Sequence, residues 1–157
     1  FIPPKKGKSH VLRIIRELIE FKPENKKTNI EIALKYLANV IKKRSIVFLI
    51  SDFYSDNNYK DALKIANKKH DLVALRIVDK AEMELPKVGL IKLKDNESGK
   101  IAWVNTDDKH FRKQFAVNQL KFEEELKDTF NRSGIDATKI FTHESYVKPL
   151  MNLFKNR

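Results

Sequence analysis

Cysteine is absent from this chain of 157 residues, and glycine occurs only four times. The chain therefore has no disulfide framework, thiolate metal site or cysteine nucleophile, and the absence favours a reducing, cytoplasmic compartment. Four glycines are too few for a glycine-rich phosphate-binding loop. No apolar run approaches the roughly 18–20 residues of a membrane span, and Phe1-Ile2-Pro3-Pro4 does not resemble a signal peptide. We expect one domain over residues 1–157 with no membrane segment.

Sequence signatures of enzymes are also missing. There is no GxSxG nucleophile motif, no P-loop and no HExxH pair. The four histidines do not have the spacing of metal ligands, and His143-Glu144 is only a weak pair near a strand end. The sequence therefore favours a protein that is not an enzyme.

The positive charge is concentrated near the start of the chain. The formal net charge is +11, and residues 1–44 carry 12 Lys/Arg against four Asp/Glu. A basic segment of this kind can attract nucleic acid, anionic lipid or an acidic protein surface. A solvated surface is the simpler reading. The side chains that would contact phosphates in the alternative, a basic nucleic-acid-binding α/β domain, are Lys5, Lys6, Lys8, Arg13 and Arg16.

Hydrophobic periodicity predicts alternating helices and strands. The class is α/β, with an open and mostly parallel sheet flanked by helices and a β-hairpin insertion near 87–105. The helix that follows the hairpin should place its phenylalanines on one core face, with Trp103 as a lid over it, while Glu82 and Glu84 lie in a solvated loop. We expect helices at about 9–21, 28–43, 57–69, 107–132 and 146–154, strands at 46–50, 72–78 and 137–143, and a hairpin formed by 86–94 and 100–105.

The stretch RSIVFLISDFYSD ends an apolar strand at Asp52. Asp52 either caps the turn before the next helix or presents a carboxylate at the end of a parallel strand, where open α/β sheets bind ligands. Ser51 and Asp56 could assist it. Thr28 has capping-box spacing to Glu31 and is most simply the N-cap of its helix, as Ser9 is of the first.

The strand at Ile46–Ile50 poses a problem of sheet topology. Its uninterrupted apolar run suits a strand covered on both faces, yet the chain offers it only one neighbour in sequence. A long apolar edge strand is a liability for a soluble protein. Either sheet material lies N-terminal to Phe1, or another copy of the chain covers the edge, and we expect this chain to self-associate.

Three segments carry a resemblance to a known family. They are residues 1–53, the run PKVGLIKLKDNESGKIAWVNTDD and the ending HESYVKPLMNLFKNR. In this order they resemble the C-terminal part of a bacterial family of unknown function with a von Willebrand factor A-like domain, whose members are usually encoded beside MoxR-type AAA+ ATPases. The resemblance implies a partial, N-terminally truncated von Willebrand A-like domain that binds proteins in complex assembly or maturation.

The resemblance also implies a divalent cation, Mg²⁺, at the carboxyl ends of the strands. The family site combines an Asp-x-Ser-x-Ser loop, a Thr and a late Asp. Thr28 and Asp52 match the last two, and no Asp-x-Ser-x-Ser occurs in this sequence. The implied metal site is therefore incomplete, and we expect no cation to be bound by these residues alone.

Overall fold

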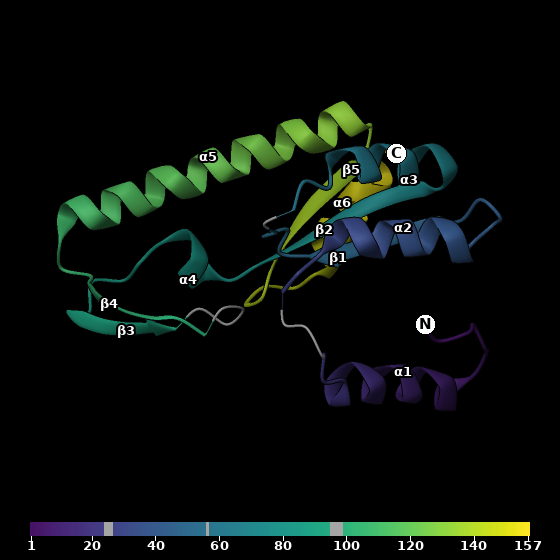
Figure 1. Cartoon of the computed structure of the whole chain (residues 1–157), viewed down its shortest axis with the longest axis horizontal. Helices are drawn as coiled ribbons and strands as arrows, with labels where there is room; N and C mark the ends of the chain where they lie inside the picture. Colours follow the sequence, from purple (N-terminus) through teal and green to yellow (C-terminus); the bar gives the residue numbers. More distant parts are fainter. Residues whose placement is uncertain (24–26, 56, 95–98) are drawn as a thin grey trace.

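A computed structural model describes residues 1–23, 27–55, 57–94 and 99–157 (Figure 1). Within these residues, helices and strands alternate much as the hydrophobic pattern predicts. The helices are α1 (Lys8–Glu20), α2 (Ile30–Val40), α3 (Lys60–Lys69), α4 (Lys80–Met83), α5 (Lys109–Ser133) and α6 (Val147–Lys155), and the strands are β1 (Ile46–Ser51), β2 (Asp71–Val78), β3 (Leu90–Lys94), β4 (Ile101–Asn105) and β5 (Asp136–Phe141).

The main sheet has the order β1-β2-β5, and both pairings are parallel. Strand β1, helix α3 and strand β2 form the predicted βαβ unit. The register aligns Ser51 with Arg76 and Arg76 with Lys139 across the three strands. The prediction of an α/β fold with a parallel sheet is confirmed.

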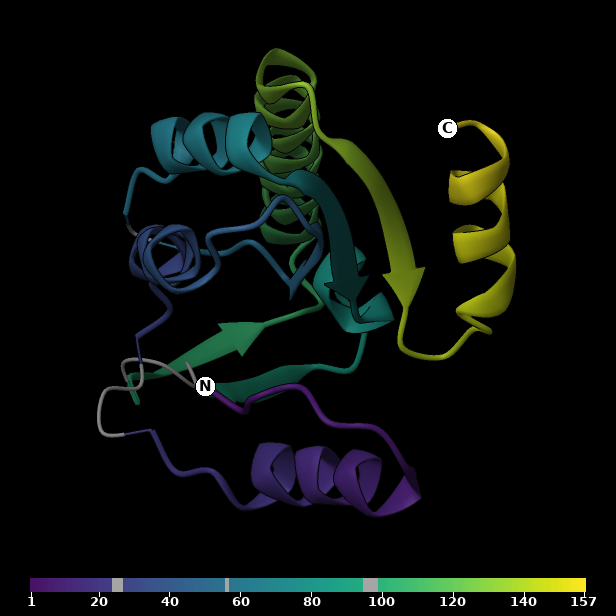
Figure 2. The ribbon, with the colours of Figure 1, turned by 90° about the vertical axis from the view of Figure 1, so that its right-hand side faces the viewer.

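Helices cover the two faces of this sheet unequally (Figure 2). Helices α2, α3 and α5 share a core with one face, whereas α6 lies on the other face and contacts β5. Strand β2 is buried along almost its whole length, since it lies between its two neighbours. The buried core on the three-helix side consists of Ile30, Leu34, Phe53, Tyr59, Ala62, Leu63, Ala66, Leu72, Ala74, Leu126, Phe130 and Ile135.

The predicted hairpin is present as the antiparallel pair β3–β4, and its turn at 95–98 lies outside the described residues. Together with the first half of α5 it extends away from the main sheet (Figure 1). The fully buried Thr106 ties the hairpin together: its hydroxyl donates to the carbonyl of Gly89 over 2.7 Å and accepts from the Val88 N–H over 3.0 Å. Arg112 of α5 donates to the carbonyl of the same threonine. The hairpin is thus attached to the start of the long helix.

The described residues cover one face of β1, whereas its apolar run suits a strand covered on both faces. Val47 and Leu49 pack against the core, but Ile46, Phe48 and Ile50 are 62%, 44% and 62% exposed. The outward face of β1 is therefore apolar without being covered by the described residues. The run of five apolar residues predicts the strand correctly.

Two predicted helix caps are wrong. Helix α1 begins at Lys8 after Gly7, whose φ is 105°, so Ser9 lies inside the helix. The N-cap of α2 is Asn29, whose side chain accepts from the Ile32 N–H over 3.0 Å, and not Thr28. Asn ranks with Asp and Ser as a capping residue. Glu31 pairs instead with Lys35 one turn later, at 2.6 Å.

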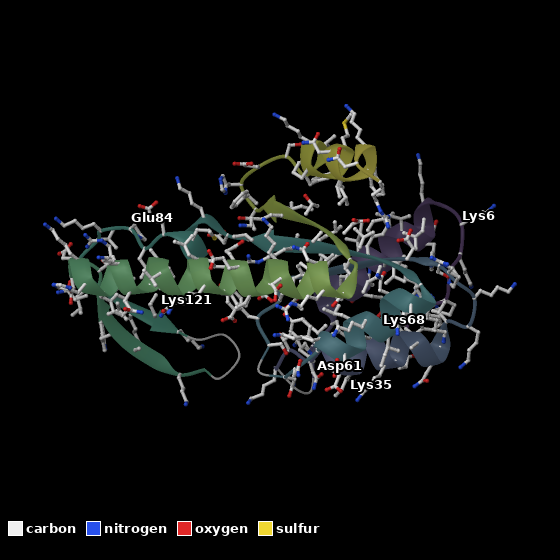
Figure 3. All side chains as sticks on the ribbon, turned by 90° about the horizontal axis from the view of Figure 1, so that it is seen from above. Lys6, Lys35, Asp61, Lys68, Glu84 and Lys121 are labelled. Atoms are coloured by element: carbon white, nitrogen blue, oxygen red, sulfur yellow. The ribbon has the colours of Figure 1, made fainter. Side chains whose placement is uncertain are left out.

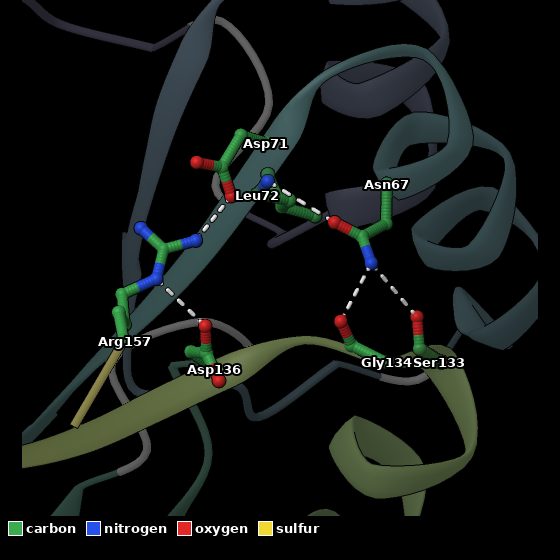
Figure 4. Close-up of polar contacts among 7 residues, drawn as sticks. All are labelled: Asn67, Asp71, Leu72, Ser133, Gly134, Asp136 and Arg157. Carbon is green, nitrogen blue, oxygen red and sulfur yellow. Dashed lines mark hydrogen bonds and ion pairs between the residues drawn. The ribbon is translucent and has the colours of Figure 1, made fainter.

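The amino ends of β2 and β5 are joined by polar contacts (Figure 4). Arg157 donates to the carboxylates of Asp71 and Asp136, which start the two strands. Asn67 of α3 donates to the carbonyls of Ser133 and Gly134 and accepts from the Leu72 N–H over 3.1 Å. These contacts fix the ends of α3, α5 and α6 at one edge of the sheet.

The remaining predictions are met in part. Trp103 is 65% exposed, so it does not act as a lid over α5. Of the phenylalanines along α5, Phe130 is buried and Phe122 packs at the edge of the core, whereas Phe111 is 39% exposed. Among the described residues, no helix is long and apolar enough to cross a membrane.

Candidate functional site

The loop after β1 is held by hydrogen bonds among its own residues. The Ser51 hydroxyl accepts from the Phe53 N–H over 3.0 Å, and Asp52 Oδ1 accepts from the Tyr54 N–H over 3.2 Å. The Ser51 hydroxyl also donates to Asp52 Oδ1 over 3.3 Å. The loop therefore fixes the exposed Asp52 carboxylate at the carboxyl end of β1 and satisfies one of its oxygens.

Phe53 has a backbone conformation that is rare for its residue type. Its φ is 64°, in the left-handed region, where a bulky residue is strained by roughly 1–3 kcal/mol. Its ring is buried and packs edge-on against Phe130, with ring centroids 5.0 Å apart, and beside Tyr59. The Tyr59 hydroxyl donates to the Phe53 carbonyl over 3.1 Å. The core thus holds the turn that presents Asp52.

The loop after β1 also contacts the segment that precedes α2. The Ser55 hydroxyl donates to the backbone carbonyl of Thr28 over 3.2 Å. The two sequence segments that were predicted to share a site therefore lie together, through a backbone contact of Thr28. Asp56, which was expected to assist, lies outside the described residues.

A buried arginine, Arg76, lies on β2 directly beside Ser51, the last residue of β1. Arg76 of β2 is 4% exposed and donates through Nη1 to Glu123 of α5. Glu123 Oε2 also lies 2.6 Å from Lys139 Nζ of β5. Burial raises the pKa of the Glu123 carboxyl, but the hydrogen bond from Lys139 and the charge of Arg76 outweigh it, and the pKa is below its ordinary value of 4.5. One carboxylate thus joins two strands to α5.

The arginine is not fully satisfied by the described residues. Its Nε and Nη2 atoms are buried without a hydrogen-bond partner among them. Its guanidinium lies 4.9 Å from the centroid of the Phe122 ring, which provides a cation–π contact. Tyr54 stacks on the same ring at 4.3 Å and donates from its hydroxyl to Gln119 Oε1 over 2.7 Å. The loop after β1, Arg76 and the middle of α5 therefore form one connected cluster.

Glu82 belongs to this cluster, although the sequence predicted a solvated loop. It lies on the short helix α4, and its Oε2 atom is buried without a partner among the described residues. The pKa of the Glu82 carboxyl is raised above 4.5, mainly because the group is partly buried, and the negative charges of Asp52 and Asp79 raise it further. A hydrogen bond from the Asp79 backbone and the positive charge of Arg76 lower the pKa, but by less. Glu84, by contrast, is exposed as predicted. No local sequence pattern identifies Glu82, because its charge interactions with Asp52 and Arg76 depend on the tertiary structure.

Asp79 has a structural role at the same edge. It caps α4 by accepting from the Ala81 N–H over 2.9 Å, and it accepts from the Thr142 hydroxyl after β5 over 2.7 Å. These two hydrogen bonds lower the pKa of its carboxyl below 3.8. Asp79 is thus committed to joining the ends of β2 and β5.

The described residues do not form a metal site by themselves. They contain no group of three or more His, Asp or Glu side chains arranged to hold an ion. Mg²⁺ prefers six oxygen ligands in octahedral geometry, and at this edge Asp52 offers one carboxylate that is already partly engaged. His143 and Glu144 lie 3.6 Å apart on the surface as an ordinary pair. The metal site that the family resemblance implies for Thr28 and Asp52 stays a prediction.

The basic residues of the nucleic-acid alternative are all exposed. Lys5 and Lys6 precede α1 and Lys8 is its first residue; the labelled Lys6 projects from the outer end of the molecule in Figure 3. Arg13 and Arg16 lie on α1 itself, where Arg13 Nε is 3.6 Å from Glu17 Oε1. This segment is separate from the Asp52 cluster.

Comparison with known proteins finds relatives that are described as uncharacterized proteins. Uncharacterized protein Rv1480 of Mycobacterium tuberculosis and uncharacterized protein Mb1516 of Mycobacterium bovis are each 22% identical to this chain over 158 residues, which is 99% of this chain and 50% of each relative. The chain thus spans about half the length of these curated relatives. Uncharacterized protein MAV169 of Mycobacterium avium is also 22% identical, over 99% of this chain and 93% of its own length.

No solved structure matches this chain. The family model that matches covers residues 1–125 and is described as a protein of unknown function, DUF58. This match includes β1, the Asp52 loop, Arg76, Glu82 and Glu123. Since it covers well over half of the sequence, the chain belongs to the DUF58 family.

Proposed function

We propose that this chain is part of a non-enzymatic protein-interaction domain of the von Willebrand A type, whose binding edge lies around Asp52. One observation carries the proposal: a strained turn, anchored by the buried Phe53, presents an exposed carboxylate at the carboxyl end of a parallel strand. Open α/β sheets bind ligands at this edge, and strained backbone persists where the surroundings hold it for a purpose.

The proposal also includes a dependence of binding on a divalent cation. Asp52 would contribute one ligand to Mg²⁺, with Thr28 on the adjacent segment. The described residues supply too few ligands, so the others would come from polypeptide outside this chain. This matches the share of its relatives that the chain spans.

A MoxR-type AAA+ ATPase is the partner that the sequence resemblance suggests. The domain would dock with this ATPase during assembly or maturation of another complex. The rigid cluster beneath the binding edge supports such a role, because a pre-organised surface loses less entropy when a partner binds.

The test is the Asp52→Asn substitution in the full-length protein. Biolayer interferometry would measure its affinity for the MoxR-type ATPase of the same organism, with Mg²⁺ and with EDTA. We expect at least about tenfold weaker binding, which corresponds to 1.4 kcal/mol, and a loss of the EDTA effect. Asp61→Asn, which changes an exposed aspartate on α3, is the matched control.

The two parts of the proposal fail separately. Unchanged ATPase binding by the Asp52→Asn protein would reject the binding edge. Binding that requires Asp52 but is insensitive to EDTA would keep the edge and reject the cation.

The alternative is a nucleic-acid-binding domain, supported by the exposure of all five basic side chains of the N-terminal segment. Phosphate contacts release counterions, so affinity would fall steeply as salt increases. Filter binding of duplex and single-stranded DNA at two salt concentrations tests this. No retention at about 50 mM salt would exclude the alternative.

A further inference from the structure

The two faces of the β3–β4 hairpin differ in exposure. Residues directly opposite each other in an antiparallel pair point to the same side, and the register places Lys92 opposite Trp103 and Ile91 opposite Val104. Ile91 and Val104 are partly buried, whereas Lys92 and Trp103 are exposed. The face that carries Trp103 is therefore the one that the rest of the described residues leave open.

This open face combines large apolar side chains with lysines. Leu90, Ile101 and Trp103 are each at least 52% exposed, and Lys92 and Lys94 are exposed beside them. We call these five residues the hairpin face: Leu90, Lys92 and Lys94 of β3 with Ile101 and Trp103 of β4. Exposed apolar groups that gather on one surface mark a binding site, whereas isolated ones do not.

The hairpin is also basic. Its described residues, 86–94 and 99–105, contain four exposed lysines and no acidic side chain. The lysines are Lys87, Lys92, Lys94 and Lys100. A surface of this charge is complementary to an anionic partner.

We infer that the hairpin face binds the surface of an anionic lipid bilayer. Trp103 suits this position because tryptophan, with an apolar ring and a polar N–H, is enriched where membranes meet water. Lys92 and Lys94 can lay their apolar stems along the face and keep their ammonium groups among the phosphates. Each lysine near such a surface strengthens binding by about fivefold.

The hairpin would lie flat on the bilayer. It projects from the main sheet together with the first half of α5 (Figure 1), so its face can approach an extended surface. The turn between the strands contains Asp95 and Glu97 in the sequence, and anionic headgroups repel carboxylates, which disfavours insertion turn first. Backbone groups at the edges of a two-stranded sheet would have no partners in hydrocarbon. The strands therefore stay at the depth of the headgroups.

A lipid surface fits this face better than a protein or a nucleic acid does. Strands of five residues give a face about 17 Å long and 10 Å wide, whereas a stable protein interface buries about 800 Å² on each partner. Bases stack on aromatic rings, and Leu90 and Ile101 provide none. A bilayer accepts any apolar side chain that enters it, and anionic lipids add attraction to the lysines. The inference does not depend on the proposed function, because the hairpin face contains no residue of the Asp52 loop.

The first test follows Trp103, the only tryptophan of this chain. Its emission in the full-length protein is isolated by subtracting the spectrum of the Trp103→Phe variant. Vesicles of phosphatidylcholine with about 30% phosphatidylglycerol present the negative surface potential that attracts lysine. We expect these vesicles to shift the Trp103 emission to shorter wavelength, and vesicles of phosphatidylcholine alone to leave it unchanged. The shift should be lost at about 1 M salt, where the Debye length is about 3 Å.

The second test reverses the charge of the face and keeps the tryptophan. The Lys92→Glu/Lys94→Glu variant should bind the anionic vesicles at least about tenfold more weakly in co-sedimentation. Lys64→Glu/Lys68→Glu, which makes the same change in net charge at two exposed lysines of α3, should bind as the wild type does. Circular dichroism would check that both variants are folded.

Three results would overturn the inference. Unchanged Trp103 emission with vesicles that the protein binds would place the lipid contact elsewhere, such as on the basic helix α1. Equal binding by the two double variants would show that the lysines of the face make no contact. Quenching of Trp103 by oligothymidylate, without a response to vesicles, would assign the face to single-stranded nucleic acid.

Discussion

Arg76 and Glu123 are joined across the interface between β2 and α5, where the carboxylate also receives Lys139. Through Phe122 and Tyr54 the pair is connected to the loop that carries Asp52, so the sheet, α5 and this loop share one set of contacts. A buried charge is costly unless it is paired, and this pair is therefore where substitutions near the site should have the clearest effect on stability.

Glu123→Gln should lower stability at neutral pH. The folded pKa of Glu123 is below 4.5, so its stabilising contribution is present above that pH and is lost as pH falls through the folded pKa. We expect a loss of about 1–3 kcal/mol at pH 7, the range for removing one partner of a hydrogen bond to a charged group, and convergence with wild type in acid. Thermal unfolding between pH 3 and pH 7 measures it, with the exposed Glu124→Gln as control. An equal loss of stability at every pH would show that the ionised carboxylate of Glu123 does not stabilise the fold.

Glu82→Gln should act in the opposite direction. The folded pKa of Glu82 is raised, so its ionised form opposes folding, and stability is lost as pH rises through that pKa. Because solvent screens a partly exposed group, we expect a gain below about 1 kcal/mol at pH 7, and no gain at low pH. Urea unfolding at both pH values measures it, beside Glu84→Gln. A destabilised variant at pH 7 would show that the carboxylate makes a favourable contact.

Gly134→Ala should destabilise the C-terminal end of α5. Gly134 has φ 63° and caps the helix, and alanine is strained in that conformation. A loss of roughly 1 kcal/mol is expected. Gly134→Asn should lose less, because asparagine tolerates the left-handed region. Chemical denaturation compares them, and equal losses would attribute the effect to contacts with Asn67 instead of the backbone.

Asn67→Ala removes three hydrogen bonds that hold α3, α5 and β2 together. Leaving backbone groups unpaired costs about 1–3 kcal/mol, and we expect a loss of this size. Asn39→Ala, an exposed asparagine on α2, should change stability by less than about 0.5 kcal/mol. Differential scanning fluorimetry of both variants would show the difference, and similar melting temperatures would reject the role of Asn67.

Local sequence signals predicted the elements of the fold well. The long apolar runs and helical periodicities identify β1, β2 and α5, and the glycine after α5 marks its end. The helix caps were harder, because Thr28 and Asn29 are adjacent and both residue types cap helices. The choice between them depends on which side chain points along the helix axis.

The candidate site was less predictable than the fold. Asp52 and its strand end follow from the sequence, but the partners of Arg76 do not, because Glu123 and Phe122 come from α5. Such contacts depend on which strands become neighbours. The exposure of Ile46, Phe48 and Ile50 likewise depends on what lies beside the strand, which no local pattern encodes.

Helix α5 has 25 residues and is about 37 Å long. The hairpin is fastened to its first turn through Arg112 and Thr106, while Gln119 and Glu123 in its middle hold Tyr54 and Arg76. A straight helix transmits tilt along its length. A displacement of the projecting hairpin would therefore reach the Asp52 cluster through α5, about two to four turns along the helix.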